Sequence, residues 1–188
     1  MPDQSPFGRL EGTVLVSACL LGVNCRYDGS SKVSRPVLEI PGIAIVPICP
    51  EQLGGLPTPR PSAQFTGGDG EAVMKGTARV IDARGQDVTA AFLVGAEQAC
   101  LLAGKLRARF AILKERSPSC GTHVVWVDGR LCEGRGAAAA SGLLSAARTA
   151  SAATPSSTAS EMVIASRFFP HDPRRFVEGG VGSASSSM

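Results

Sequence analysis

A long helical pattern followed at once by a short apolar run constrains the fold more than any other feature of this chain. The helix is predicted to begin at Asp87, a residue type that caps helices, and apolar residues then recur at three- and four-residue spacing. Three basic residues, Lys105, Arg107 and Arg109, come late in the run, where the helix dipole favours them. The next five residues, FAILK from Phe110 to Lys114, are predicted to form a buried strand.

Two earlier runs have the same character as FAILK. TVLVS, from Thr13 to Ser17, and IAIVPI, from Ile43 to Ile48, are short, rich in β-branched residues and bounded by loop signals. A strand, a crossover helix and a second strand favour parallel pairing in an α/β layer. We therefore expect an α/β fold with a mostly parallel sheet and flanking helices.

The remaining segments divide the chain into one domain and a tail. Residues 73–85 suggest a small hairpin or excursion, and Val124 to Cys132 a hairpin that turns at Asp128-Gly129. The alanine-rich residues 136–150 favour a helix. The domain is predicted to span 12–150, with a low-complexity segment and flexible tail over 151–188 in which Met162 to Ser166 forms one last strand.

The composition is that of a globular domain. The 188 residues are 44% hydrophobic and 19% charged with a formal net charge of +3, which argues against a polybasic nucleic-acid binder. No apolar run approaches the roughly 18–20 residues of a membrane span. VSAC, Val16 to Cys19, is similar to a lipoprotein cleavage site but lacks the apolar core of a signal peptide, so a cytoplasmic protein is expected.

Three of the six cysteines follow the predicted parallel strands. Cys19 comes two residues after TVLVS, Cys49 directly after IAIVPI, and Cys120 six residues after FAILK. The carboxyl ends of parallel strands meet at one edge of a sheet, where ligands bind. Converging thiolates suit soft metals and iron–sulfur clusters. The alternative is that each cysteine is simply buried, as free cysteines often are.

The other three cysteines have weaker claims to a site. Cys25 either completes a set of four thiols or lies near the site as a bystander. Cys100 falls inside the helical pattern and Cys132 inside the predicted hairpin, so both are interpreted as packing residues. In a reducing compartment none of the six is expected to form a disulfide.

Four motifs in this order resemble those of the thiouracil desulfidase family: VSACLLGVNCRYDG, CPEQLGGLPTPRPSAQ, DVTAAFLVGA and AILKERSPSCG. The resemblance covers about Thr13 to Gly136. It implies an enzyme, a hydrolase or lyase, that removes sulfur from a thiolated nucleobase such as 2-thiouracil without net redox chemistry. By motif position it also implies a 4Fe-4S cluster on Cys19, Cys49 and Cys120, and catalytic roles for Glu51 and Ser117.

The chemistry of these residue types agrees with that resemblance. Three thiolates leave one iron without a protein ligand, and an open metal position of this kind acts as a Lewis acid. Glu51 is suited to take a proton from water and return it, and Ser117 to orient substrate or water. The alternatives are a solvated loop carboxylate at Glu51 and a local turn hydrogen bond at Ser117.

Other functions and substrates stay open from the sequence. The polar residues Arg26, Tyr27, Asp28, Lys32 and Arg60 either contact a base or fix their loops through salt bridges. A non-catalytic iron–sulfur or zinc-binding module and a sulfurtransferase with a cysteine persulfide are alternative functions. A small thiolated base is favoured over thiolated tRNA because no basic stripe is present, no membrane partner is expected, and the oligomeric state is open.

Overall fold

The first sheet contains all three predicted parallel strands. The computed structural model describes residues 10–143 and the backbone of a strand at 162–166. In this sheet β1 (Gly12–Ser17) pairs in parallel with β2 (Ile43–Ile48) on one side and with β5 (Phe110–Lys114) on the other. The predicted last strand, β8 (Met162–Ser166), pairs antiparallel with β5 and gives the order β2-β1-β5-β8. The α/β fold is confirmed.

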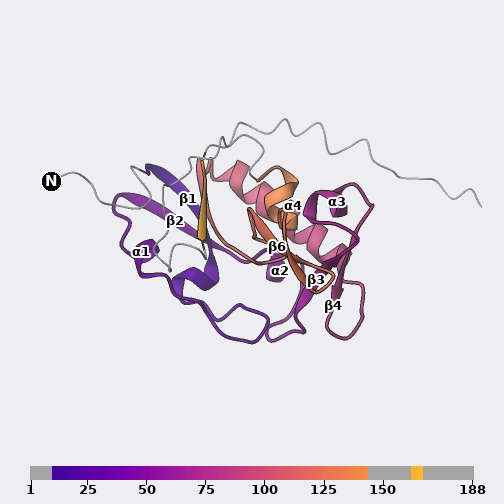
Figure 1. Ribbon diagram of the computed structural model, residues 1–188. Helices are drawn as coiled ribbons and strands as arrows, with labels where there is room; N and C mark the ends of the chain where they lie inside the picture. Colours follow the sequence, from indigo (N-terminus) through magenta and orange to yellow (C-terminus); the bar gives the residue numbers. More distant parts are fainter. Residues whose placement is uncertain (1–9, 144–161, 167–188) are drawn as a thin grey trace, which may run out of the picture.

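A second sheet, with the order β4-β3-β6-β7, lies on the other side of the molecule (Figure 1). It consists of β3 (Ala63–Thr66), β4 (Arg79–Asp82), β6 (Val124–Val127) and β7 (Arg130–Glu133). The predicted hairpin is present as β6 and β7, and its turn residues Asp128 and Gly129 have positive φ angles of 46° and 77°. The predicted excursion contains the end of α3 (Gly70–Met74) and β4, which pairs antiparallel with β3.

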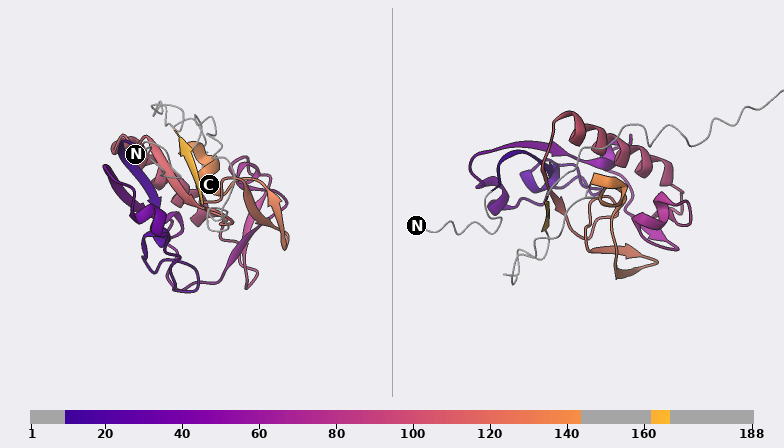
Figure 2. Two further views of the ribbon diagram at one scale, coloured as in Figure 1. Left: turned by 60° about the vertical axis from the view of Figure 1, so that its left-hand side comes forward. Right: turned by 90° about the horizontal axis from the view of Figure 1, so that it is seen from above.

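The long helix α4 (Thr89–Lys105) extends from the second sheet to the first (Figures 1 and 2). It begins at Thr89 and not at Asp87, because Val88 N is still bonded to Val80 O of β4. The N-cap position is Val88, which makes no side-chain cap bond, whereas Asp87 forms a local turn just before the helix in which its Oδ1 accepts a hydrogen bond of 2.9 Å from Thr89 N. None of the helices in the described part of the chain combines the length and apolarity that a bilayer span requires.

The hydrophobic core follows the alternation of side chains along the strands. Leu15 and Leu113 face α4, where they pack in a cluster with Phe92 and Ala96. Their neighbours Val14, Val16 and Ile112 face the opposite side of the sheet and pack with Val37 of α1 (Arg35–Leu38). Burial on both faces explains why these strands are continuous apolar runs.

The short helix α2 (Pro50–Leu53) sits directly on α4 because glycines face each other at the contact. A Cβ added to Gly54 would lie 2.0 Å from Ala91 O, and one added to Gly95 would lie 1.9 Å from Pro50 O. Only glycine allows two backbones to approach this closely. The contact fixes α2, and therefore the segment that joins Cys49 to Glu51.

In its described part, the helix predicted for residues 136–150 is present only as a short, kinked helical stretch over residues 137–143. A π-helical turn, η2 (Ala139–Leu143), is present there, and Gly142 within it has a φ of 99°, which breaks regular helix geometry. Before this turn, Ala137 N and Ala138 N donate to Pro118 O and Ser119 O, at 2.8 and 2.9 Å. The segment therefore supports the loop that carries Cys120. Residues 144–150 and the rest of the predicted tail, apart from β8, lie outside the described residues.

Candidate functional site

A cavity of about 480 Å³ opens where β1, β2 and β5 end and extends to the second sheet. Its walls come from the loops after those strands and from β3, β4 and β6. The volume lies in the range of small-molecule pockets. The edge at which the sequence placed the site is therefore hollow. The opposite wall, with Gln64 and Trp126, belongs to the second sheet, of which the sequence indicated the β6–β7 hairpin but not its pairing with β3.

All three predicted ligand cysteines line this cavity. Cys19 lies in η1 (Ala18–Leu21), which begins directly after β1, and Cys49 joins β2 to α2. Cys120 lies in the loop between β5 and β6. Cys25 lines the same cavity and is 2% exposed, so the structure brings four thiols together and not three.

Three of the thiols that line the cavity have raised pKa values. The Cys19 thiol, together with burial, raises the pKa of Cys25 to about 11, against an opposing effect of Cys49. The Cys25 thiol and burial likewise raise the pKa of Cys49. Burial raises the pKa of Cys120 to about 12, against a hydrogen bond with Ser17. These three thiols are neutral at pH 7, and a metal centre that binds them as thiolates must release their protons.

The donor set at the cavity consists of thiols, the ligand type that soft metals and iron–sulfur clusters accept. Within residues 10–143, no group of three or more His, Cys, Asp or Glu side chains converges as a single-ion site requires. The thiols instead line a cavity together, from separate loops. Thiolates around a cavity are the ligands that iron–sulfur clusters use.

Glu51 lies in the first turn of α2 and lines the cavity. Its side chain is 15% exposed, so it is not the solvated loop carboxylate of the alternative interpretation. Oε2 accepts a hydrogen bond of 2.6 Å from Arg60 Nε, and Oε1 accepts one of 3.0 Å from Ser119 Oγ. Sequence reasoning missed Ser119, although it lies in the SPSC motif that drew attention to Ser117.

Ser117 also lines the cavity, and it makes the local turn contacts that the alternative interpretation described. Its Oγ accepts hydrogen bonds of 3.2 Å from the backbone N–H groups of Ser119 and Cys120. A hydroxyl has two lone pairs and one hydrogen. Because both lone pairs are engaged by these N–H groups, the remaining capacity of Ser117 is to donate its hydrogen.

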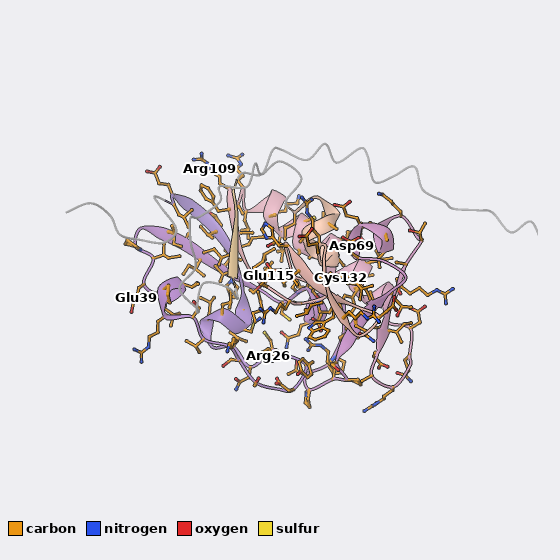
Figure 3. All side chains as sticks on the ribbon, viewed as in Figure 1. Arg26, Glu39, Asp69, Arg109, Glu115 and Cys132 are labelled. Atoms are coloured by element: carbon orange, nitrogen blue, oxygen red, sulfur yellow. The ribbon has the colours of Figure 1, made fainter. Side chains whose placement is uncertain are left out.

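The polar residues around Cys25 divide between the two proposed roles. Arg26 and Tyr27 line the cavity, and the Arg26 guanidinium lies 5.6 Å from the centre of the Tyr27 ring. Arg26 also pairs with Asp28 at 3.5 Å, and Figure 3 shows it at the rim of the molecule. Arg60 fixes loops, because it binds Glu51 and the carbonyl oxygens of Cys25 and Pro57.

Cys100 and Cys132 do not line the cavity, as predicted for packing residues. Cys100 Sγ lies 3.1 Å from Ser141 Oγ, a contact between α4 and η2. Cys132 belongs to β7 on the second sheet (Figure 3). These two thiols therefore serve as controls for the four that line the cavity.

The loop with Ser117 and Cys120 is closed by a residue that the sequence did not single out. Glu115, at the centre of the molecule in Figure 3, is 4% exposed. Its carboxylate accepts hydrogen bonds from Val124 N at 2.8 Å, Thr122 Oγ1 at 2.8 Å and His123 N at 3.1 Å. It thereby joins the two ends of the loop. His123 itself is half exposed, and its Nδ1 lies 3.0 Å from Thr122 Oγ1.

We expect Glu115→Gln to destabilise the fold by about 3 kcal/mol at pH 7, because an amide cannot satisfy the same donors. Burial opposes ionisation of Glu115, but hydrogen bonds from Val124, His123 and Thr122 outweigh it and lower its pKa below the ordinary 4.5. A lowered pKa stabilises the fold above about pH 4.5, and this contribution is lost as the pH falls through the folded-state pKa. Urea unfolding at pH 7 and pH 4 measures both effects.

The control for this prediction is Glu133→Gln, which changes an exposed carboxylate on β7. The difference in unfolding free energy between the wild type and Glu115→Gln should shrink at pH 4, whereas Glu133→Gln should match the wild type at both values. Equal stability of Glu115→Gln and the wild type at pH 7 would show that the loop does not depend on this carboxylate.

Comparison with known proteins places these features in a family. A family model described as 2-thiouracil desulfurase matches residues 14–153. The match continues beyond Gly136, so the expected end of the resemblance was wrong. Residues 136–143 still pack against the Cys120 loop.

Two individual proteins are similar over most of their length. The uncharacterised protein YbbK of Bacillus subtilis (strain 168) is 41% identical over 131 residues, which cover 68% of this chain and 87% of YbbK. The solved structure of TudS, a 4Fe-4S-dependent thiouracil desulfidase, is 40% identical with a TM-score of 0.55. The similarity covers 69% of this chain and 83% of that one.

Proposed function

Because this chain belongs to the 2-thiouracil desulfurase family, we propose that it is an enzyme that removes sulfur from a thiolated nucleobase such as 2-thiouracil. The products are uracil and sulfide, and the reaction involves no net redox change. The observation that carries the proposal is the cavity at the strand ends, where Cys19, Cys49 and Cys120 meet Glu51 and Ser117.

The proposed cofactor is a 4Fe-4S cluster on Cys19, Cys49 and Cys120. Two observations support it: the thiols line one cavity from three loops, and the similar protein TudS is 4Fe-4S-dependent. When bound through three thiolates, the cluster supplies one iron with Lewis acidity for a soft thiocarbonyl sulfur. Cys25 is the reserve candidate for a ligand.

The protein's own groups divide the proton transfers between them. The Glu51 carboxylate takes a proton from the water that adds to the thiocarbonyl carbon, and later returns it. Ser117 donates a hydrogen bond to the substrate or to this water, since its lone pairs are occupied by the N–H groups of Ser119 and Cys120. The exposed faces of Tyr27 and Trp126, which line the same cavity, are suited to stack on a flat base.

The cavity favours a small substrate. A volume of about 480 Å³ accommodates a nucleobase with a modest substituent. The formal net charge of +3 gives little general attraction for a polyanion. We therefore propose a small thiolated base as the substrate, with thiolated tRNA as the alternative to be tested beside it.

The test is anaerobic reconstitution with iron and sulfide, followed by incubation with 2-thiouracil or with thiolated tRNA. We expect uracil and sulfide in equal amounts from the free base, and no turnover by the iron-free protein. Turnover without iron would identify a persulfide sulfurtransferase instead. A stable cluster with no turnover of either substrate would identify a non-catalytic iron–sulfur module.

A further inference from the structure

Both oxygens of the Glu51 carboxylate are held by side chains from other segments. Arg60 Nε donates to Oε2 at 2.6 Å, and Ser119 Oγ donates to Oε1 at 3.0 Å. Arg60 lies beyond the end of α2, whereas Ser119 belongs to the loop that carries Cys120. A carboxylate held at both oxygens by separate segments can neither rotate nor withdraw from the cavity without breaking a bond.

Arg60 is built into the protein and does not reach Glu51 by chance. Its side chain is 4% exposed. Nη1 donates to Pro57 O and Thr58 Oγ1, both at 3.1 Å, and Nη2 donates to Cys25 O at 3.0 Å. A planar guanidinium with a hydrogen bond at every nitrogen has one orientation. The loops that hold Arg60 therefore also determine where the Glu51 carboxylate lies.

Ser119 connects Glu51 to the other proposed catalytic group. Ser119 is 2% exposed, and its backbone N–H donates a hydrogen bond to Ser117 Oγ at 3.2 Å. Its hydroxyl meanwhile donates to Glu51 Oε1. One buried residue therefore fixes the position of the carboxylate through its side chain and the position of the Ser117 hydroxyl through its backbone.

We propose that Arg60 and Ser119 are positioning residues that hold the Glu51 carboxylate in the one orientation from which it exchanges protons in the cavity. The proposal rests on the proposed function of Glu51 as the proton carrier. Neither residue needs to touch the substrate. Loss of orientation at a reacting group slows the chemical step far more than it weakens binding.

Ser119→Ala is the test, because it removes one hydroxyl and leaves the backbone bond to Ser117 Oγ in place. We expect kcat to fall about 10- to 100-fold while KM stays within about 2-fold, with an unchanged iron content per chain. The matched control is Ser141→Ala, which removes a hydroxyl that donates to Ala138 O at 2.9 Å away from the cavity. It should leave kcat at the wild-type value.

The decisive measurement repeats Ser119→Ala in a Glu51→Gln background. If Ser119 acts through Glu51, its loss costs almost nothing further there, because effects on one unit are not additive. A merely structural role would reduce kcat by the same factor in both backgrounds. Arg60→Lys, which keeps a charge but not the planar fork, should behave in the same way, and crystals of Ser119→Ala should show Glu51 in more than one rotamer.

The possible results separate this proposal from the proposed function. Two results would overturn the positioning role alone, provided that the reconstituted wild type turns over. One is a wild-type kcat in Ser119→Ala, and the other is a fall in kcat caused by Ser119→Ala that is as large in the Glu51→Gln background as in the wild type. No turnover by the reconstituted wild type overturns the proposed function, and the positioning role with it. A single ordered Glu51 rotamer in crystals of Ser119→Ala also contradicts the positioning role.

Discussion

Serine at Cys19, Cys49 or Cys120 will leave a folded protein that binds little iron and does not convert 2-thiouracil. Each substitution replaces one thiolate by a hydroxyl that iron–sulfur clusters rarely accept as a ligand. All three side chains line one cavity, so each substitution removes a ligand from the same proposed cluster site. Iron and sulfide analysis after anaerobic reconstitution measures the loss, and thermal unfolding of the apo-protein shows whether the fold survives.

The controls and the fourth thiol decide which cysteines are ligands. Cys132→Ser and Cys100→Ser change thiols outside the cavity and should keep both the cluster and the activity. Cys25→Ser should keep the cluster if three thiolates suffice. If Cys25→Ser loses iron and Cys49→Ser retains it, Cys25 is the third cluster ligand and Cys49 is not. This exchange is possible because the two thiols are direct neighbours.

The parallel strands could be predicted because a strand packed inside the protein is a run of apolar residues, which can be recognised from the local sequence. β1, β2 and β5 are short, mostly apolar runs, and the helix between β2 and β5 makes parallel pairing the expected solution. Cysteines placed after such strands must meet at one edge. Their arrangement around one cavity therefore follows from local patterns along the chain.

The second sheet could not be predicted in the same way. Its strands are four residues each, and β3 contains the polar residues Gln64 and Thr66. The junction between the two hairpin-like halves of this sheet is a short parallel contact in which Phe65 pairs with Val127. A contact between residues so far apart in sequence leaves no periodic signal, and so the far wall of the cavity was missed.

Within the site, the sequence identified motifs but not the direction of their side chains. The SPSC motif contains two serines, and only the geometry of the turn decides that Ser119 donates to Glu51 while Ser117 accepts from the backbone. Arg60 likewise had two roles open to it. Its burial against Glu51 depends on loops that meet only in the folded chain.

Glu51→Gln is expected to lower kcat by about 10²- to 10⁴-fold without loss of the cluster, because glutamine has nearly the same shape but cannot accept the proton of water. Single-turnover formation of uracil measures the change. The buried Arg60 then loses its charge partner, so the unfolding temperature is recorded beside the rate. The matched control is Glu71→Gln, which removes one partner of an exposed ion pair between Glu71 of α3 and Arg135. It should keep the wild-type rate. A wild-type rate in iron-loaded Glu51→Gln would assign the proton transfers to another group. A reconstituted protein that keeps its cluster but forms no uracil, with or without the Glu51→Gln substitution, would fit a binding module and not an enzyme.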